Sequence, residues 1–277
     1  MKKTVPDFYK MKAKGEKITM VTAYDYPAAR WVEAAGIDMI LVGDSLGMVV
    51  LGYDSTVPVT MEDVLHHTKA VRRGAPQTFI VADMPFMSYA TSQDALINGG
   101  RLIKEGGADA VKLEGGEYYA ATVELLTKTG IPVVGHIGLT PQTAGQLGGF
   151  KVQGKDLAGV RRLEEDAKLL QAAGAFAIVL EAIPRQVAGH LTENITIPTI
   201  GIGAGPGCDG QVLVFHDMLG IFDRFKPKFV KQYARLGEQA IAAFQTYNQD
   251  VKNGSFPADE HTFHLSDNVI DKLDGQK

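Results

Sequence analysis

The stretch GGADAVKLEGG, residues 106–116, carries the unit from which the architecture can be predicted. Two glycines precede a short apolar run, Ala110–Leu113, and the acidic Glu114 follows it directly. Glycine at such a place closes a preceding helix in the left-handed conformation at little cost. A short continuous apolar run is typical of a parallel strand buried on both faces. The stretch therefore predicts the end of a helix, a buried strand and a polar strand exit.

The same unit recurs along the chain, with glycine again just before an apolar run at Gly36, Gly130 and Gly174. Because parallel strands need helical crossovers, the segments between the runs are expected to hold helices. Eight alternating units favour a (β/α)₈ TIM barrel, an α/β fold, over an open doubly wound sheet, which remains the alternative. The expected strands are Ile18–Tyr24, Met39–Val42, Thr78–Ala82, Ala110–Leu113, Pro132–His136, Phe176–Leu180, Pro198–Ile202 and Gln211–Phe215.

Further helices are expected within the chain and at both of its ends. Two internal helices are expected to begin at Thr60 and Thr91, because threonine is a favourable N-cap residue. An extra N-terminal helix is expected over Val5–Lys14 and a long closing helix over Lys228–Val251. Residues 256–277 form a polar tail, either docked or disordered. No linker or shift in composition divides residues 1–277, so a single barrel domain is expected.

Composition excludes several classes of protein. The chain has 277 residues, of which 45% are hydrophobic and 22% charged, an ordinary globular composition. Its net charge is -4 and it has no long Lys/Arg run, which argues against nucleic-acid binding. The single cysteine, Cys208, agrees with a reducing compartment, so a cytoplasmic location is expected. The N-terminus lacks a secretory signal, and Asp44 and Ser45 interrupt the most apolar stretch, so no membrane span is expected.

Ionisable side chains follow five successive strands of the expected barrel. Such barrels build their active sites at the carboxyl ends of the strands. Any one of these residues alone would be read as a solvated carboxylate or a helix cap, but four carboxylates, a lysine and a histidine together indicate a metal or acid–base site. The candidates are Asp44 and Ser45 after the second strand, Asp83 after the third, Lys112 and Glu114 at the fourth, His136 at the fifth and Glu181 at the sixth.

The residue types refine this prediction. Lys112 and Glu114 are two positions apart, so both side chains share one face of the strand and can point into the barrel mouth. Clustered carboxylates repel one another unless a cation or a shared proton intervenes. Oxygen ligands without cysteine or paired histidines favour Mg²⁺ over zinc. These arguments predict a metal or acid–base site and name no substrate.

Other polar motifs are interpreted as structural. Gly201–Gly205 follows the seventh strand and could hold a phosphate, but tight strand-to-loop packing is the favoured role. No Rossmann context surrounds it, so dinucleotide binding is rejected. His66 and His67 fall in a helical stretch and are expected to cover its surface, and His216 has no ligand-like spacing around it.

The strand-end motifs resemble those of the ketopantoate hydroxymethyltransferase family over nearly the full chain. The run GHIGLTPQ, residues 135–142, is quite specific, and all matching segments occur in the family's order without a departure at a motif position. The matching segments are Thr19–Asp25, Val42–Gly47, Ala82–Phe86, Val111–Gly116, Gly135–Gln142 and Ile200–Gly205.

The resemblance implies a (β/α)₈ barrel of the phosphoenolpyruvate mutase/isocitrate lyase superfamily. It implies Mg²⁺ as cofactor, and 3-methyl-2-oxobutanoate and 5,10-methylenetetrahydrofolate as small-molecule partners. The implied reaction transfers a hydroxymethyl group from the folate to the oxo acid, giving 2-dehydropantoate for pantothenate biosynthesis, the route to the coenzyme A precursor. The resemblance further implies a large homo-oligomer, a decamer.

The resemblance also implies roles for the candidate residues. Asp44 and Asp83 bind the metal and, through it, the substrate, and Glu114 lies in the same metal site. Ser45 and Lys112 contact the oxo acid, and Lys112 adds positive charge where negative charge develops. Glu181 accepts the proton, and His136 supports it as a further catalytic residue. These types suit the reaction, because the hydrogen beside a ketone is a poor acid and needs both a base and charge stabilisation.

Two other functions stay open at this point. A lyase or mutase of the same superfamily would carry a cysteine in a Lys-Lys-Cys-Gly-His-type loop, but the only cysteine here is Cys208, in Gly207-Cys208-Asp209. A barrel that only binds a metabolite would bind the oxo acid without exchanging its proton, and fold alone never excludes that. The carboxylate cluster argues against the second reading.

Overall fold

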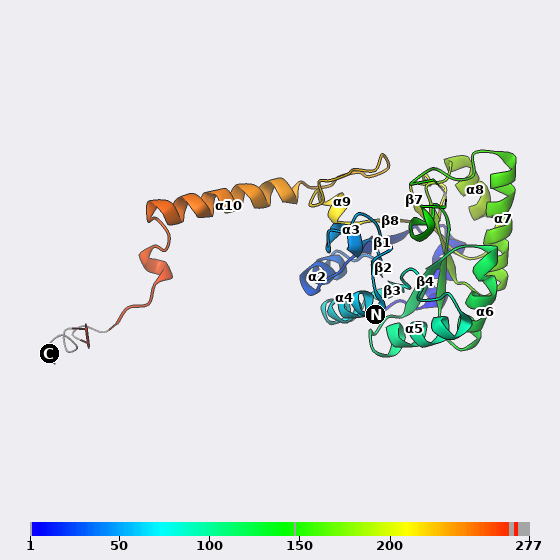
Figure 1. Ribbon diagram of the computed structural model, residues 1–277, viewed down its shortest axis with the longest axis horizontal. Coiled ribbons are helices and arrows are strands. Elements are labelled where there is room, and N and C mark those ends of the chain that lie inside the picture. The colour runs from blue at the N-terminus through cyan, green and yellow to red at the C-terminus, as the bar shows by residue number, and fades with distance from the viewer. Residues whose placement is uncertain (1, 147, 266–268, 271–277) are drawn as a thin grey trace.

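The chain forms a closed barrel of eight parallel strands, each hydrogen-bonded to the next in chain order and β8 to β1 (Figure 1). The computed structural model describes residues 2–146, 148–265 and 269–270. The barrel confirms the predicted fold, and the predicted strands differ from the observed ones mainly at their ends. The strands are β1 Ile18–Thr22, β2 Met39–Val42, β3 Phe79–Asp83, β4 Ala110–Glu114, β5 Val133–Gly138, β6 Ala177–Glu181, β7 Thr199–Ile202 and β8 Gly210–Leu213.

Helices surround the barrel and fill most of the crossovers (Figure 1). Thr60 and Thr91 cap α4 and α5 by accepting the N–H groups of Asp63 and Asp94, as predicted. The helices are α1 Val5–Lys14, α2 Tyr26–Ala34, α3 Leu46–Val49, α4 Met61–Gly74, α5 Ser92–Lys104, α6 Ala120–Lys128, α7 Leu157–Ala172, α8 Arg185–Asn194, α9 Phe215–Met218 and α10 Leu236–Asn253. Short 3₁₀ turns are η1 Glu117–Tyr119, η2 Pro141–Thr143 and η3 Asp259–His261.

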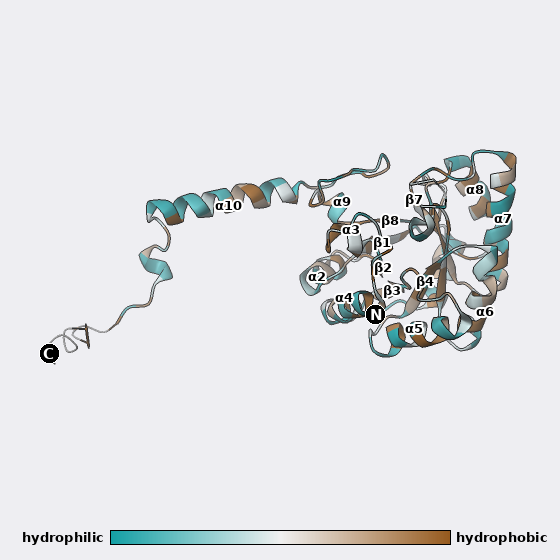
Figure 2. Ribbon diagram, viewed as in Figure 1, coloured by the Kyte–Doolittle hydropathy of each residue, from teal (hydrophilic) through white to brown (hydrophobic). Residues whose placement is uncertain are grey.

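Two apolar cores follow from the alternation of side chains along each strand. In β2, Ile40 and Val42 belong to the core shared with the surrounding helices, whereas Met39 and Leu41 belong to a second core inside the barrel. Figure 2 shows the same division, with hydrophobic strands and helices whose outer faces are hydrophilic. The inner core leaves the carboxyl end of the barrel free for the polar side chains described below.

The predicted N-terminal helix forms with its predicted bounds and closes the opposite end of the barrel. Phe8 of α1 is fully buried in the inner core. Its ring lies 5.1 Å from that of Phe79, edge to face, and 6.3 Å from that of Phe176. Phe79 begins β3 and Phe176 directly precedes β6. The aromatic plug therefore occupies the amino ends of the strands, opposite the end at which such barrels build their active sites.

Two predicted elements near the C-terminus need correction. The last strand was expected over Gln211–Phe215, but β8 ends at Leu213 and Phe215 begins α9, with its N–H donated to the Thr22 hydroxyl. The closing helix was expected over Lys228–Val251, but α10 spans Leu236–Asn253. Residues 228–235 are not helical because their backbone turns back onto α9. Tyr233 donates to the carbonyl of Met218 at 2.7 Å instead of forming a helical turn.

Helix α10 extends away from the barrel (Figure 1). None of its residues is buried, although Ile241, Phe244 and Tyr247 are apolar or aromatic. Beyond it, residues 256–265 are exposed and contain η3, so this part of the tail does not dock on the barrel. The rest of the predicted tail, apart from residues 269–270, lies outside the described residues. No helix among the described residues combines the length and apolarity needed to cross a bilayer.

Candidate active site

The predicted site residues come together at the carboxyl ends of β2 to β6. The register of the barrel places them side by side, because Asp83 pairs with Lys112 and Glu114 pairs with His136 on neighbouring strands. Burial is nearly complete for most of the cluster, with exposed fractions between 2% and 4%, and Ser45 and Glu181 are partly exposed. The buried members are Asp44, Asp83, Lys112, Glu114 and His136.

The turn after β2 brings Asp44 against Asp83. The backbone N–H of Asp44 donates to Asp83 Oδ2 at 3.0 Å. A Cβ atom at Gly43 would lie 2.9 Å from the Ser45 hydroxyl oxygen and 3.4 Å from Asp83 Oδ2, so the turn leaves little room for a side chain. The Ser45 hydroxyl in turn lies 2.8 Å from the hydroxyl of Tyr24, two residues after the end of β1. The exits of β1, β2 and β3 are therefore joined into one polar wall.

Lys112 is the cation at the centre of the cluster. Its ammonium lies 3.1 Å from Asp83 Oδ1 and 3.9 Å from Glu114 Oε1. The contact with Glu114 agrees with the prediction that Lys112 and Glu114 share one face of β4. It also lies 3.1 Å from His136 Nδ1. Burial alone would lower the pKa of Lys112, but the charges of Asp83, Glu114 and Asp44 outweigh burial and raise it. Lys112 is therefore charged at neutral pH.

The cluster carries more negative charge than Lys112 can neutralise. Burial, followed by the charge of Asp83, raises the pKa of Asp44 from its ordinary value of 3.8 to about 7. Burial and the charge of Asp44 raise the pKa of Glu114 well above its usual range. Carboxylates in this situation either hold a proton or are balanced by a cation.

The donor set fits a hard divalent cation in its chemistry. Asp44, Asp83 and Glu114 offer only carboxylate oxygens, the ligands that Mg²⁺ prefers. Asp83 Oδ1 is buried and accepts no hydrogen bond, since the nearby Lys112 ammonium is not aligned with it. In the described part of the chain, no three His, Cys, Asp or Glu side chains stand at the mutual spacing of a formed metal site. Cation binding would therefore require these side chains to draw closer.

His136 links Lys112 to Glu181. The Lys112 ammonium can only donate, so His136 Nδ1 accepts from it and the ring proton belongs on Nε2. That Nε2 lies 3.2 Å from Glu181 Oε2, although the ring N–H is not aligned with the oxygen. Burial, followed by the charge of Lys112, lowers the pKa of His136. His136 is therefore a neutral donor that faces the Glu181 carboxylate.

The backbone around Glu181 is tightly constrained. Gly138 adopts a φ of +97°, and a Cβ atom there would lie 2.3 Å from the Glu181 carbonyl oxygen. Leu139 donates its N–H to that same oxygen at 2.9 Å. Directly after Glu181, Ala182 adopts a φ of +46°, a left-handed conformation that is uncommon outside glycine. The exits of β5 and β6 thus fix where the Glu181 side chain leaves the barrel.

Two further residues, Gln142 and Tyr89, belong to the site, and the search for polar residues at strand ends missed both of them. Gln142, in η2, is buried, and its side-chain amide donates to Asp44 Oδ2 at 2.8 Å. Tyr89, in the loop before α5, donates its hydroxyl to the Gln142 side-chain oxygen. Gln142 is the last residue of the GHIGLTPQ run, which was the available signal. Its position depends on a 3₁₀ turn that carries no strand-like pattern.

The glycine-rich turn after β7 and the two histidines of α4 have the structural roles that the sequence predicted. Gly203 and Gly205 have left-handed φ values and close neighbours, since Cβ atoms there would lie 2.7 Å from the Phe229 ring and 2.5 Å from Arg185 Cβ. This confirms the tight-packing role of the glycine-rich turn. His66 is exposed, and His67 is half-buried with its Nδ1 bonded to the Tyr24 carbonyl.

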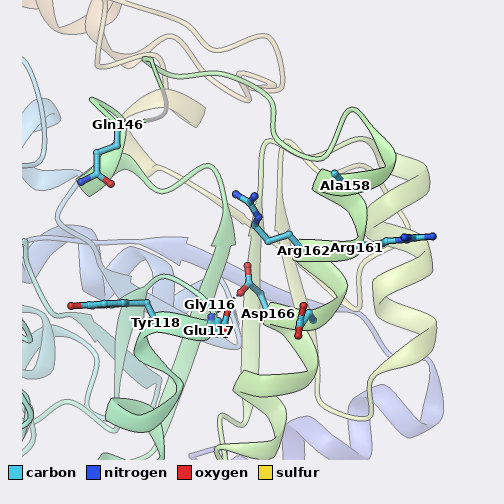
Figure 3. Close-up of a pocket in the computed structure, with 9 residues that line it drawn as sticks. Gly116, Glu117, Tyr118, Gln146, Ala158, Arg161, Arg162 and Asp166 are labelled. Atoms are coloured by element: carbon cyan, nitrogen blue, oxygen red, sulfur yellow. Dashed lines mark hydrogen bonds between the residues drawn. The ribbon is translucent and has the colours of Figure 1, made fainter.

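A separate hollow of about 830 Å³ lies beside the mouth, between η1 and the start of α7. Figure 3 shows Tyr118, Gln146 and Arg162 around it, with Asp166 on α7. Asp166 accepts the backbone N–H of Glu117 at 2.7 Å. None of the predicted site residues lines this hollow, so it is distinct from the carboxylate cluster.

Comparison with known proteins places the chain in one family. Residues 2–259 match the family model described as ketopantoate hydroxymethyltransferase. A 3-methyl-2-oxobutanoate hydroxymethyltransferase of Moorella thermoacetica is 60% identical over 261 residues, covering 94% of this chain and 97% of the relative. The enzyme of the same name from Thermus thermophilus is 57% identical over 263 residues, covering 95% of this chain and all of the relative.

Solved structures resemble the fold at low sequence identity. A phosphoenolpyruvate phosphomutase from Streptomyces platensis has a TM-score of 0.60 and 16% identity, covering 99% of this chain and 96% of its own. A 2,3-dimethylmalate lyase, described as a PEP mutase/isocitrate lyase superfamily member, has a TM-score of 0.58 and 16% identity, covering 100% and 99%. At this identity the likeness concerns the barrel alone, whereas the family match extends over nearly the whole sequence. The chain is an enzyme that belongs to the ketopantoate hydroxymethyltransferase family.

Proposed function

We propose that the chain transfers a hydroxymethyl group from 5,10-methylenetetrahydrofolate to 3-methyl-2-oxobutanoate, giving 2-dehydropantoate for pantothenate biosynthesis. Relatives 56–60% identical carry the name of this transferase. The observation that carries the proposal is the buried cluster at the exits of β2 to β6, where the Asp83 and Glu114 carboxylates contact one ammonium and a neutral imidazole faces the Glu181 carboxylate. Such a cluster suits abstraction of a proton beside a ketone.

Asp44, Asp83 and Glu114 would hold Mg²⁺ as cofactor. Their oxygens match the preference of this ion, and their excess negative charge favours binding. Bound Mg²⁺ would neutralise the negative charge that builds up on the oxo acid as its proton leaves.

Lys112 and Ser45 would position the oxo acid. The Lys112 ammonium would attract the carboxylate and the developing charge on the keto oxygen. It is held in place by Asp83 and His136, both 3.1 Å away. The Ser45 hydroxyl, kept near the Tyr24 hydroxyl, would offer a hydrogen bond to the same substrate.

Glu181 would accept the proton from the carbon next to the ketone. Its side chain is 15% exposed, so it can reach a substrate in the mouth while most water is kept away. The Nε2 atom of the neutral His136 lies 3.2 Å from Glu181 Oε2. A turn of the ring that aligned its N–H with this oxygen would orient the carboxylate and leave Oε1 to take the proton. The resulting enolate would form the new carbon–carbon bond with the methylene carbon of the folate as one of the two carbon–nitrogen bonds to that carbon breaks. Water would then replace the second nitrogen, supplying the hydroxyl group and releasing tetrahydrofolate.

A homo-oligomer, a decamer as the family resemblance implies, is the proposed assembly, and the cytoplasm the proposed compartment. The apolar side chains along α10, among them Ile241, Phe244 and Val251, are exposed on a helix that contacts little of its own barrel. A helix in this state needs a partner to bury its apolar face, and further copies of the chain supply one.

The test of the proposed function is product formation by the purified protein. Mixing it with 3-methyl-2-oxobutanoate, 5,10-methylenetetrahydrofolate and Mg²⁺ should yield 2-dehydropantoate, detected by mass spectrometry. Omitting either substrate should abolish the product, and EDTA should do so reversibly. Absence of product from the folded protein with all components present would reject the proposal.

A further inference from the structure

Gln142 hydrogen-bonds to two carboxylates of the cluster, one through its side chain and one through its backbone. Its Nε2 donates to Asp44 Oδ2 at 2.8 Å and to the carbonyl oxygen of Met84 at 3.0 Å. Its backbone N–H donates to Glu114 Oε2 at 3.0 Å. One residue of η2 therefore contacts two of the three carboxylates proposed to hold the cation.

The orientation of the Gln142 amide is determined by its neighbours. Both groups next to Nε2, the Asp44 carboxylate and the Met84 carbonyl, are acceptors, so the NH₂ group must face them. The remaining oxygen, Oε1, accepts the hydroxyl of Tyr89 at 2.5 Å. Burial and the charge of Glu114 raise the pKa of Tyr89, so this phenol is a donor at neutral pH. A flipped amide would turn Oε1 toward two acceptors and leave the Tyr89 hydroxyl only the longer bond to the Glu114 carbonyl, at 3.4 Å.

We propose that Gln142 is a positioning residue for the cation site, holding the Asp44 and Glu114 carboxylates in orientation while Tyr89 fixes the direction of its amide. The inference rests on the proposed function for its cation and goes beyond it by naming a residue that touches no reacting atom. Partners that orient metal ligands raise metal affinity because the ligand carboxylates lose less freedom when the ion binds.

The fold of the turn does not depend on the Gln142 side chain. Thr143 donates its N–H to the Thr140 carbonyl, and the hydroxyls of these two threonines lie 2.6 Å apart. Ala144 donates to the Pro141 carbonyl in the same turn. A substitution at Gln142 should therefore leave η2 formed and change mainly the freedom of the Asp44 carboxylate, because the bond to Glu114 comes from the backbone.

The experiment measures Mg²⁺ binding to the assembled protein by calorimetry, without substrates. Gln142→Met keeps the side-chain length and removes the amide, so it should weaken Mg²⁺ affinity about tenfold or more. Tyr89→Phe removes only the donor to Oε1 and should weaken affinity by a smaller factor. The double variant should bind Mg²⁺ no more weakly than Gln142→Met, because Tyr89 acts through Gln142. Gln146→Met, on the same loop and exposed, is the matched control and should bind as wild type.

The steady-state kinetics provide a second readout. For Gln142→Met the Mg²⁺ concentration that gives half-maximal rate should rise by the same factor as Kd, and saturating Mg²⁺ should restore most of kcat. Unchanged Mg²⁺ affinity in folded Gln142→Met and Tyr89→Phe would overturn the proposal, even if thermal stability fell. Wild-type protein that transfers the hydroxymethyl group without binding a divalent cation would overturn it too, while leaving the proposed reaction intact. Wild-type protein that binds Mg²⁺ but makes no product would reject the reaction and leave the positioning role to be decided by Kd.

Discussion

Asp44→Asn should stabilise the cation-free protein at alkaline pH while weakening Mg²⁺ binding. In the folded protein burial and the charge of Asp83 raise the pKa of Asp44 to about 7, from an ordinary value of 3.8 that describes the unfolded chain. Between these values the folded state holds a proton that the unfolded state has lost, so stability falls as pH rises through this window. Asparagine has nearly the same shape, carries no charge and can still accept the Gln142 amide.

The magnitude follows from the same pKa values. Linkage contributes about 1.4 kcal/mol for each pH unit that separates the folded and unfolded pKa values, which gives a limit of about 4 kcal/mol for Asp44 above pH 7. Glu114 shares the electrostatic destabilisation of the folded protein, because its pKa is also raised. We therefore expect Asp44→Asn to raise the free energy of unfolding by about 2–4 kcal/mol at pH 8. Near pH 4 both proteins should have similar stability.

The assay is urea unfolding in EDTA at several pH values and one protein concentration, compared with the same series in excess Mg²⁺. In Mg²⁺ the wild type should recover stability that Asp44→Asn cannot, because the variant lacks a cation ligand. Asp54→Asn is the control, since the Asp54 side chain is fully exposed and its replacement should leave the free energy of unfolding unchanged. A stability difference between Asp44→Asn and wild type that is independent of pH, or a loss at pH 8 in EDTA, would refute the reasoning.

Three further predictions concern the base, the plug and the assembly. Glu181→Gln should leave Mg²⁺ affinity within a few-fold of wild type but slow deuterium uptake by the oxo acid about 10²–10⁴-fold, measured by NMR; an unchanged rate would make His136 the leading candidate for the base. Phe8→Ala should lower the free energy of unfolding by about 3–5 kcal/mol in urea titrations without changing Mg²⁺ affinity; equal stability would contradict the aromatic plug. Sedimentation should show a homo-oligomer well above dimer mass, and a monomer at micromolar concentration would contradict the proposed assembly.

The barrel could be predicted because its strands are buried on both faces. Continuous apolar runs such as Met39–Val42 need no partner to be recognised, and glycines such as Gly36 and Gly130 mark the helix ends before them. The last strand and the closing helix were less predictable. Within residues 228–235, Tyr233 bonds to Met218 of α9, a contact distant in sequence, and an amphipathic pattern does not reveal that α10 leaves the barrel.

The candidate site was predictable where it follows from topology alone. Once eight parallel strands close, the exits of neighbouring strands must meet, which brings Asp83 beside Lys112 and Glu114 beside His136. Gln142 and Tyr89 lie in loops, where no periodicity indicates which way a side chain points. Their contact with Asp44 depends on the path of the chain through η2 and could be found only in three dimensions. The roles assigned to the site residues stay predictions until tested.

The central claim is that this barrel removes a proton from 3-methyl-2-oxobutanoate with the help of a divalent cation. The most direct test incubates the wild-type protein with the oxo acid in D₂O, without folate, and follows deuterium at the carbon next to the ketone by NMR. The account predicts exchange with Mg²⁺, its loss in EDTA and its return when Mg²⁺ is restored. Tight binding of the oxo acid with no exchange in the presence of Mg²⁺ would contradict it and leave a barrel that only binds the metabolite.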